Sequence, residues 1–196
     1  MLAVVAAVGL IVAFLLPALE SARATSRRVQ CLNSLRQLSL AAFNYQEREG
    51  VFPPGYLTNL TDDGSELGPS WGWSARMLPE LEQSAVYSTI DFRLPISAPE
   101  NSTACSSWMS TLQCPSSESG RNVPVVLRDR NGKVLMESVS ASNYVGSAGT
   151  SAPGEQPDPD DGVFLRNRWI GPDHLKDGMS HTLMFGERSR SLSDAT

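Results

Sequence analysis

The chain has 196 residues, a formal net charge of -5 at pH 7, 41% hydrophobic residues, two histidines and three cysteines. This length accommodates one ordinary globular domain with an appendage. The acidic balance argues against nucleic acid as a partner, and the lack of a Cys-x2-Cys pair excludes a zinc site of the paired-cysteine type.

An apolar run opens the chain. No charged or strongly polar side chain precedes Glu20, and sixteen helical residues would rise about 24 Å, slightly less than a bilayer core of about 30 Å. A helix that is apolar on every side must be covered all round, which a buried position in this polar domain would hardly provide. We therefore expect residues 1–20 to lie in lipid or against other helices, and we assign the assembly surface to Val5, Gly9, Phe14 and Pro17.

The helix is expected to continue as an amphipathic half over residues 21–50. Pro17 removes one backbone hydrogen bond and predicts a kink rather than an end. Gly50 is the next glycine or proline, and it predicts the stop. One apolar stripe at helical spacing lies between them: Cys31, Leu35, Leu38, Ala42 and Tyr45. Such a helix would be about 70 Å long.

Residues 51–196 predict a globular α+β head with a small antiparallel sheet and long loops. The segment VFPPGYL predicts an extended exit from the helix. The segment that follows contains Trp71 and Trp73, for which two interpretations stand. They pack in the core under a short helix whose first turn holds Pro79, or they form an aromatic platform for stacking on a carbohydrate.

The later part of the head predicts strands. Two apolar-rich runs in residues 122–140 flank Asn131-Gly132, a strong hairpin signal. Further strands are expected in SASNYVGSAG, in GVFLRNRWI and from Thr182 to Phe185, the last after a turn at Asp177-Gly178. The economical arrangement is one antiparallel sheet packed on the apolar stripe of the long helix.

An acidic loop is a candidate calcium site. Asp158, Asp160 and Asp161 precede Gly162, and Ca²⁺ prefers several oxygen ligands on a flexible loop. The twelve-residue calcium-loop pattern is absent, and three prolines within the loop also fit a solvated, semi-rigid turn without an ion. Both interpretations remain, and no other cofactor is expected.

Catalytic chemistry has no supporting motif. The segment IGPDHLKDGMSHTLMFGE gathers polar residues that resemble a metal or acid–base set: Asp173, His174, Asp177, His181 and Glu187. Their spacing matches no ligand pattern, since neither a helical His pair four residues apart nor H-E-x-x-H is present. No G-x-S-x-G elbow supports a serine nucleophile. We expect that the protein is not an enzyme.

Five segments together carry a family resemblance: LLPALESARATSRRVQCLNSLRQLSLAAFNYQEREGVFPPG, WGWSARMLPELEQSAVY, LQCPSS, SNYVGSAG and DGMSHTLMFGE. In this order they resemble the planctomycete-type family of prepilin-like proteins. Members have an N-terminal prepilin methylation helix followed by a domain of unknown function, and they are also catalogued near solute-binding proteins. The design is similar to that of type IV pilins and type II secretion pseudopilins, so the resemblance implies a pilin-like fold.

The resemblance implies a single-pass protein of the bacterial inner membrane, with its head in the periplasm or outside the cell. It implies assembly with itself or other pilin-like subunits, and a basic leader before Met1 that a prepilin peptidase cleaves from the full-length precursor. The head would be C-terminally incomplete. Cys31 and Cys114 lie in family-matching segments, so we pair them, with Cys105–Cys114 and three free thiols as alternatives. The alternative function is a membrane-tethered extracytoplasmic solute- or carbohydrate-binding module.

Overall fold

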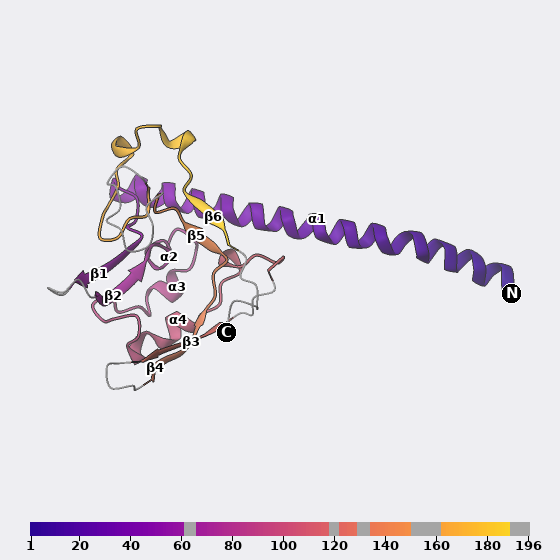
Figure 1. Cartoon of the computed structure of the whole chain (residues 1–196), viewed down its shortest axis with the longest axis horizontal. Helices are drawn as coiled ribbons and strands as arrows, with labels where there is room; N and C mark the ends of the chain where they lie inside the picture. The colour runs from indigo at the N-terminus through magenta and orange to yellow at the C-terminus, as the bar shows by residue number, and fades with distance from the viewer. Residues whose placement is uncertain (61–65, 118–121, 129–133, 150–161, 189–196) are drawn as a thin grey trace.

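The computed structural model describes residues 1–60, 66–117, 122–128, 134–149 and 162–188. Within these ranges, side chains are described except at 2–12, 14, 66–69, 122–128 and 134–138. One long helix forms a rod, and the rest of the chain forms a head around its C-terminal part (Figure 1). The predicted α+β class is confirmed.

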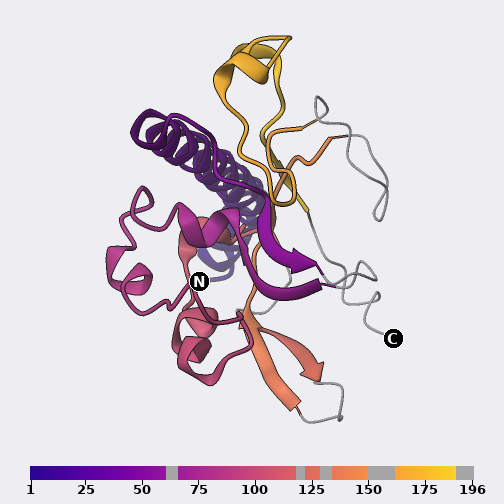
Figure 2. The ribbon, with the colours of Figure 1, turned by 90° about the vertical axis from the view of Figure 1, so that its left-hand side faces the viewer.

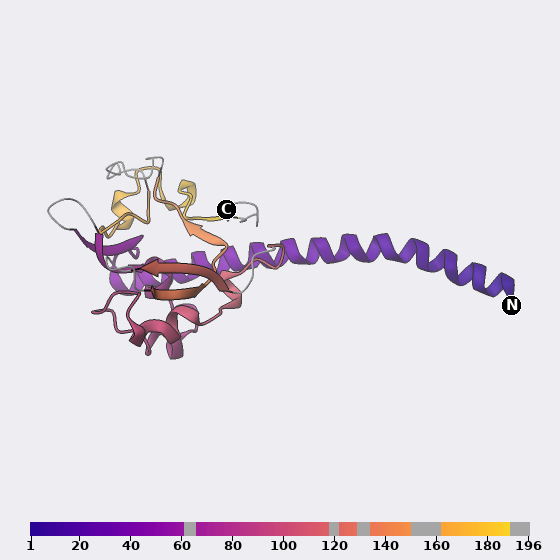
Figure 3. The same ribbon diagram turned by 60° about the horizontal axis from the view of Figure 1, so that its bottom comes forward.

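The rod is the single helix α1, Leu2–Glu49, with Pro17 inside it. Its 48 residues correspond to about 72 Å at 1.5 Å per residue. The N-terminal part curves gently and is unbroken (Figure 3). The helix ends at Gly50, whose φ of 78° is left-handed and whose N–H donates to the carbonyl of Gln46 at 2.7 Å. This is the glycine stop that the sequence predicts.

The head is built from short elements. Its helical segments are α2 Trp73–Arg76, α3 Ser84–Tyr87, η1 Pro99–Asn101, α4 Ser102–Ser106, η2 Ser110–Leu112, η3 Pro172–His174 and η4 Met179–His181. Its strands are β1 Tyr56–Leu60, β2 Glu66–Gly72, β3 Asn122–Arg128, β4 Val134–Ser140, β5 Tyr144–Gly146 and β6 Phe185–Glu187.

The strands form three separate two-stranded antiparallel sheets, β1–β2, β3–β4 and β5–β6. The expectation of one sheet on the helix is wrong in this respect. The hairpin β3–β4 is confirmed, although its Asn131-Gly132 connection lies outside the described residues. It projects on the side of the head opposite to η3 and η4 (Figure 2). The last strand spans Phe185–Glu187 rather than Thr182–Phe185 and pairs Glu187 with Tyr144. The expected turn lies one residue earlier, with Lys176 and Asp177 at its centre, and the N–H of Gly178 donates to the carbonyl of Leu175 at 2.9 Å.

The segment GVFLRNRWI, residues 162–170, is irregular rather than a strand. It touches the chain that leaves α1 through single bridges, Phe52 with Ile170 and Tyr56 with Arg166. Asn167 has a φ of 54°, a left-handed conformation that asparagine tolerates better than most residues. Its amide exchanges two 2.8 Å hydrogen bonds with the backbone N–H and carbonyl of Thr58. The Asn167 side chain thus makes the pair of backbone hydrogen bonds that a neighbouring strand would otherwise make.

The core lies where the stripe of α1 meets these loops. Leu38 and Ala42 are fully buried, Cys31 and Tyr45 are buried, and Leu35 packs against the cluster, so the predicted stripe is confirmed. The head contributes Phe52, Met77, Leu81, Leu112, Cys114, Tyr144, Val163, Phe164, Met184 and Phe185. Because the buried residues recur every three or four positions, only one face of the helix enters the head.

The segment after β2 differs from its predicted single helix. It forms two four-residue helices, α2 and α3, and Pro79 lies in the turn between them rather than in a first helical turn. Met77, Leu78 and Leu81 are buried at this turn. The segment from α2 to α3 is therefore held on the core by these buried side chains, although it is not one continuous helix.

Candidate functional site

The N-terminal part of α1 projects beyond the head. Every side chain from residue 15 to residue 30 is exposed, and burial begins at Cys31. The exposed residues include three leucines, with exposed fractions of 52% for Leu15, 56% for Leu16 and 52% for Leu19. A helix with exposed leucines and no covering element is an unsatisfied apolar surface.

The residues assigned to assembly all lie on this projecting part. Val5, Gly9 and Phe14 are helical in backbone, and their side chains lie outside the described part; Pro17 is exposed. Among the described residues, no helix combines the length and the apolar character that crossing a membrane requires.

A disulfide joins α1 to the head at the point where the helix emerges. It links Cys31 with Cys114, whose Cα atoms are 5.1 Å apart, and leaves Cys105 free. The predicted pairing is confirmed. The buried side chain of Asn143 positions Cys114 by accepting a 3.0 Å hydrogen bond from its backbone N–H. Asn143 also donates its backbone N–H to the carbonyl of Leu112 at 2.9 Å.

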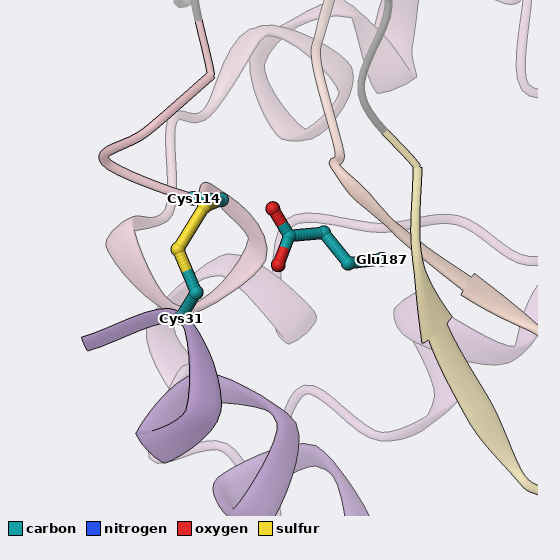
Figure 4. A group of neighbouring side chains, drawn as sticks. All are labelled: Cys31, Cys114 and Glu187. Carbon is teal, nitrogen blue, oxygen red and sulfur yellow. A yellow bond between two sulfur atoms is a disulfide. The ribbon is translucent and has the colours of Figure 1, made fainter. Parts of the chain in front are cut away.

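Two further side chains lie against this disulfide. The Glu187 carboxylate points toward it from β6 (Figure 4). The Tyr144 hydroxyl donates to the carbonyl of Cys31 at 3.3 Å. Burial raises the pKa of Tyr144 above its ordinary 10, a hydrogen bond with Ser34 opposes this, and the Glu187 charge adds to it. The sulfurs and the carboxylate lie within 4.8 Å of one another, but sulfurs joined in a disulfide supply no thiolate ligands.

A second anchorage fixes the head end of α1. Arg48 donates through Nε at 3.0 Å and Nη2 at 2.6 Å to Oε1 of Glu80, which lies in the turn after α2. The Glu80 side chain is only 8% exposed. Arg48 also pairs with Glu49 and lies over the Tyr45 ring, 5.3 Å from its centroid. A nearly buried carboxylate is thus neutralised by a cation from the helix.

The two tryptophans lie in the interior. Trp71 is 3% exposed, and its indole N–H donates to the carbonyl of Leu94 at 3.0 Å. The half-buried Trp73 packs against Phe164 and Phe185, with ring centroids 5.7 and 5.0 Å away. The core-packing interpretation describes both residues. The burial of Trp71 argues against a role for it in a surface platform, and the carbohydrate platform as a whole stays a prediction.

An apolar pocket lies beside Trp71. Its volume is about 230 Å³ and it is partly open to solvent. The walls come from the ends of β2 and β4, from α2, α3 and α4, and from the loops between them. The lining residues are Trp71, Gly72, Ser74, Ala75, Leu78, Val86, Ile90, Ile96, Ala104, Cys105, Ser107, Met109, Leu112, Val139, Ser140 and Ser142. None of them is charged. No local sequence pattern indicates this pocket, because its walls come from segments as far apart in the chain as Trp71 and Ser142.

The polar residues of the C-terminal segment do not form a site. His174 and His181 are exposed, and His174 lies 3.1 Å from the neighbouring Asp173. Glu187 is at the disulfide instead. The calcium candidates Asp158, Asp160 and Asp161 lie outside the described residues. The absence of an enzyme activity and of a cofactor stays a prediction.

A family model described as SBP_bac_10, protein of unknown function (DUF1559), matches residues 20–196. The chain belongs to this family. The match supports the part of the resemblance that concerns a domain of unknown function, whereas the prepilin-like part stays a prediction. No curated protein and no solved structure gives a significant match.

The DUF1559 match covers the head and the amphipathic half of α1, and it begins after the apolar residues 1–19. Asn143 is the positioning residue that the sequence analysis misses. Asparagine is common in turns, so nothing in SASNYVGSAG distinguishes an amide that orders a distant cysteine from one that caps a loop.

Proposed function

We propose that this DUF1559 protein is a pilin- or pseudopilin-like structural subunit that assembles through its N-terminal helix. One observation carries the proposal. A single unbroken helix supplies the apolar stripe of the head with its C-terminal part, and it extends free of the head with its N-terminal part. Packing on the head accounts only for the C-terminal part of α1. The remaining part, which extends about 40 Å beyond the head, therefore calls for a separate role.

The exposed leucines give assembly a driving force. Complete burial of a leucine is worth about 1.5–3 kcal/mol, and Leu15, Leu16 and Leu19 are each about half exposed. Covering the three by neighbouring helices would therefore contribute about 2–4 kcal/mol per subunit. Lipid would cover the same surface before assembly, and replacing lipid by partner helices then relies on close packing of small residues.

The proposed location follows from the same helix. The apolar residues 1–19 favour a single-pass position in the bacterial inner membrane, with the head on the periplasmic or outer side. The Cys31–Cys114 disulfide supports an oxidising compartment for the head. The proposed partners are copies of the chain or other pilin-like subunits, the lipid bilayer, and a prepilin peptidase acting on the precursor.

The test is self-association of the full chain. Replacing Leu15, Leu16 and Leu19 together with glutamine should abolish association in analytical ultracentrifugation, and so should deletion of residues 1–19. The matched control is Leu183→Gln, since Leu183 is 72% exposed but lies on the head; it should leave association unchanged. A wild-type chain that stays monomeric and soluble without detergent or lipid would refute the proposal.

The alternative is a membrane-tethered binding module. The observation that favours it is the apolar pocket beside Trp71, since ligand sites are commonly concave and mostly apolar. The two functions are compatible, because the pocket lies in the head and the assembly surface lies on the projecting helix.

A further inference from the structure

We propose that the pocket beside Trp71 is a binding site for a small, neutral, largely apolar molecule, such as a substituted benzene or a short-chain alcohol. The proposal concerns the head alone and does not rest on the assembly function. It follows from three features of the pocket: walls that are fixed in place, a lining without charge, and a volume suited to a small ligand.

The walls are held by hydrogen bonds of Asn101, which lies outside the pocket lining, and of Trp71, which is part of it. Asn101 is completely buried; its side-chain oxygen accepts the backbone N–H of Asp91 at 2.9 Å, and its amide donates to the carbonyls of Asp91 and Pro95, each at 3.2 Å. The indole N–H of Trp71 binds the next part of the same loop, at Leu94. The loop carrying Ile90 and Ile96 is therefore ordered without a ligand, which lowers the entropic cost of binding.

The lining selects against charged and sugar-like ligands. None of its residues is charged, so a buried carboxylate, phosphate or ammonium would lose its hydration without gaining a counter-charge. The polar groups present are hydroxyls such as those of Ser74, Ser107 and Ser142, together with the Cys105 thiol. A sugar would bury several hydroxyls against a mostly aliphatic wall, whereas a ligand with one hydroxyl or none would not.

The volume sets the size of the ligand. An apolar cavity of about 150 Å³ accommodates benzene. The present pocket of about 230 Å³ would therefore take a molecule of roughly ten non-hydrogen atoms. Because the pocket is partly open, such a molecule can enter without unfolding of the head.

Cys105 provides a reporter inside the pocket. Its thiol donates to the carbonyl of Ile96 at 3.5 Å and is partly exposed. Burial raises the pKa of this thiol, so at neutral pH it is uncharged and reacts slowly. It is the one unpaired cysteine among the three of the chain. Alkylation therefore reports on a single thiol in the lining of this pocket.

The first experiment uses the full-length protein, in detergent-free buffer or in lipid nanodiscs. The rate of Cys105 alkylation by iodoacetamide is followed by intact mass with p-xylene or 1-hexanol as probe, and with glucose, glutamate or phosphate as controls. The apolar probes should slow alkylation at least fivefold in a saturable way, and the controls should not. Unchanged rates with both apolar probes, or equal protection by glucose, overturn the proposal. So does protection that appears only as the protein concentration rises, since a second copy would then cover the pocket.

The second experiment fills the pocket. Ala75→Phe places a ring in the pocket wall of α2, and Ala85→Phe places the same ring on the exposed face of α3. Probe-induced thermal stabilisation should disappear in A75F and persist in A85F. Equal stabilisation of both variants overturns the proposal. If A75F does not fold, the alkylation of the wild-type chain decides alone. Self-association of the projecting helix is measured separately, so failure of either proposal leaves the other standing.

Discussion

Removing the disulfide should cost the head several kilocalories per mole. Cys31 and Cys114 are 83 residues apart in sequence, and the chain-entropy model for a closed loop of this size gives about 4.6 kcal/mol at 25 °C. Measured losses on removal of a native disulfide from a small secreted domain are typically about 2–5 kcal/mol. We therefore expect the double variant Cys31→Ser/Cys114→Ser to lose about 3–4 kcal/mol of unfolding free energy.

The assay is urea unfolding followed by tryptophan fluorescence, because Trp71 is buried and the half-buried Trp73 packs against the core. With a urea slope of about 2 kcal/mol per molar, the expected loss lowers the midpoint by about 1.5–2 M. Dithiothreitol should shift the wild-type midpoint by the same amount and leave the double variant unchanged. Cys105→Ser removes a thiol that closes no loop, and it should stay within about 1 kcal/mol of the wild type.

A loss below about 1 kcal/mol in the double variant would refute this reasoning. It would mean either that the unfolded chain is already constrained near these residues or that the junction gains contacts when the crosslink is absent. An unchanged wild-type midpoint in dithiothreitol, together with intact-mass evidence of two reduced thiols, would lead to the same conclusion without any substitution.

Three further predictions concern other contacts of the head. Gly55→Ala should destabilise the fold by about 2–4 kcal/mol, because its Cβ would overlap the backbone of Phe164. Arg48→Ala should cost about 1–3 kcal/mol in urea unfolding, since it leaves the nearly buried carboxylate of Glu80 without its cation. The raised pKa of Tyr144 predicts that unfolding free energy falls as pH rises through and above 10, because the unfolded chain loses the phenolic proton first; Tyr144→Phe should flatten that fall.

Each of these has a matched comparison. Gly186→Ala introduces a Cβ with ordinary contact distances, so a loss equal to that of the Gly55 variant would contradict the steric argument. Glu49→Gln removes the exposed partner of Arg48 and should stay within about 0.5 kcal/mol. The pH series is best run with Cys105→Ser, since that thiol also has a raised pKa. A slope above pH 10 that is unaltered by Tyr144→Phe would show that other groups cause it.

The long helix was predictable because its signals are local and repeated. The stripe from Cys31 to Tyr45 and the stop at Gly50 involve residues three or four positions apart, and no distant contact is needed to place them. The Cys31–Cys114 pairing came from a resemblance rather than from spacing. A single short helix was expected after Trp73, whereas Met77 and Leu81 are buried in a turn between two four-residue helices.

The arrangement of the head was not predictable in the same way. Two four-residue helices are too short to be specified by helical periodicity, since isolated helices of that length are unstable. Residues 162–170 have the composition of a strand, but Asn167 forms its side-chain bonds with Thr58, 109 positions away. At the pocket beside Trp71, the Asn101 side chain likewise accepts a hydrogen bond from a distant backbone N–H, that of Asp91, and so orders the loop that forms part of the wall. Amide side chains that replace backbone pairing have no periodic signature.

The disulfide lies between the two proposed functional parts and couples them physically. On one side, Cys31 is the first buried residue among the α1 side chains that the structure describes, so a force on the projecting helix is transmitted to the head at this residue. On the other side, Cys114 is two residues from Leu112, which lines the pocket and is bound to Asn143. Reduction should therefore weaken the protection of Cys105 by p-xylene as well as the stability of the head. If reduction lowers stability while leaving that protection intact, the pocket is held by Asn101 and Trp71 alone, and assembly and ligand binding are mechanically independent.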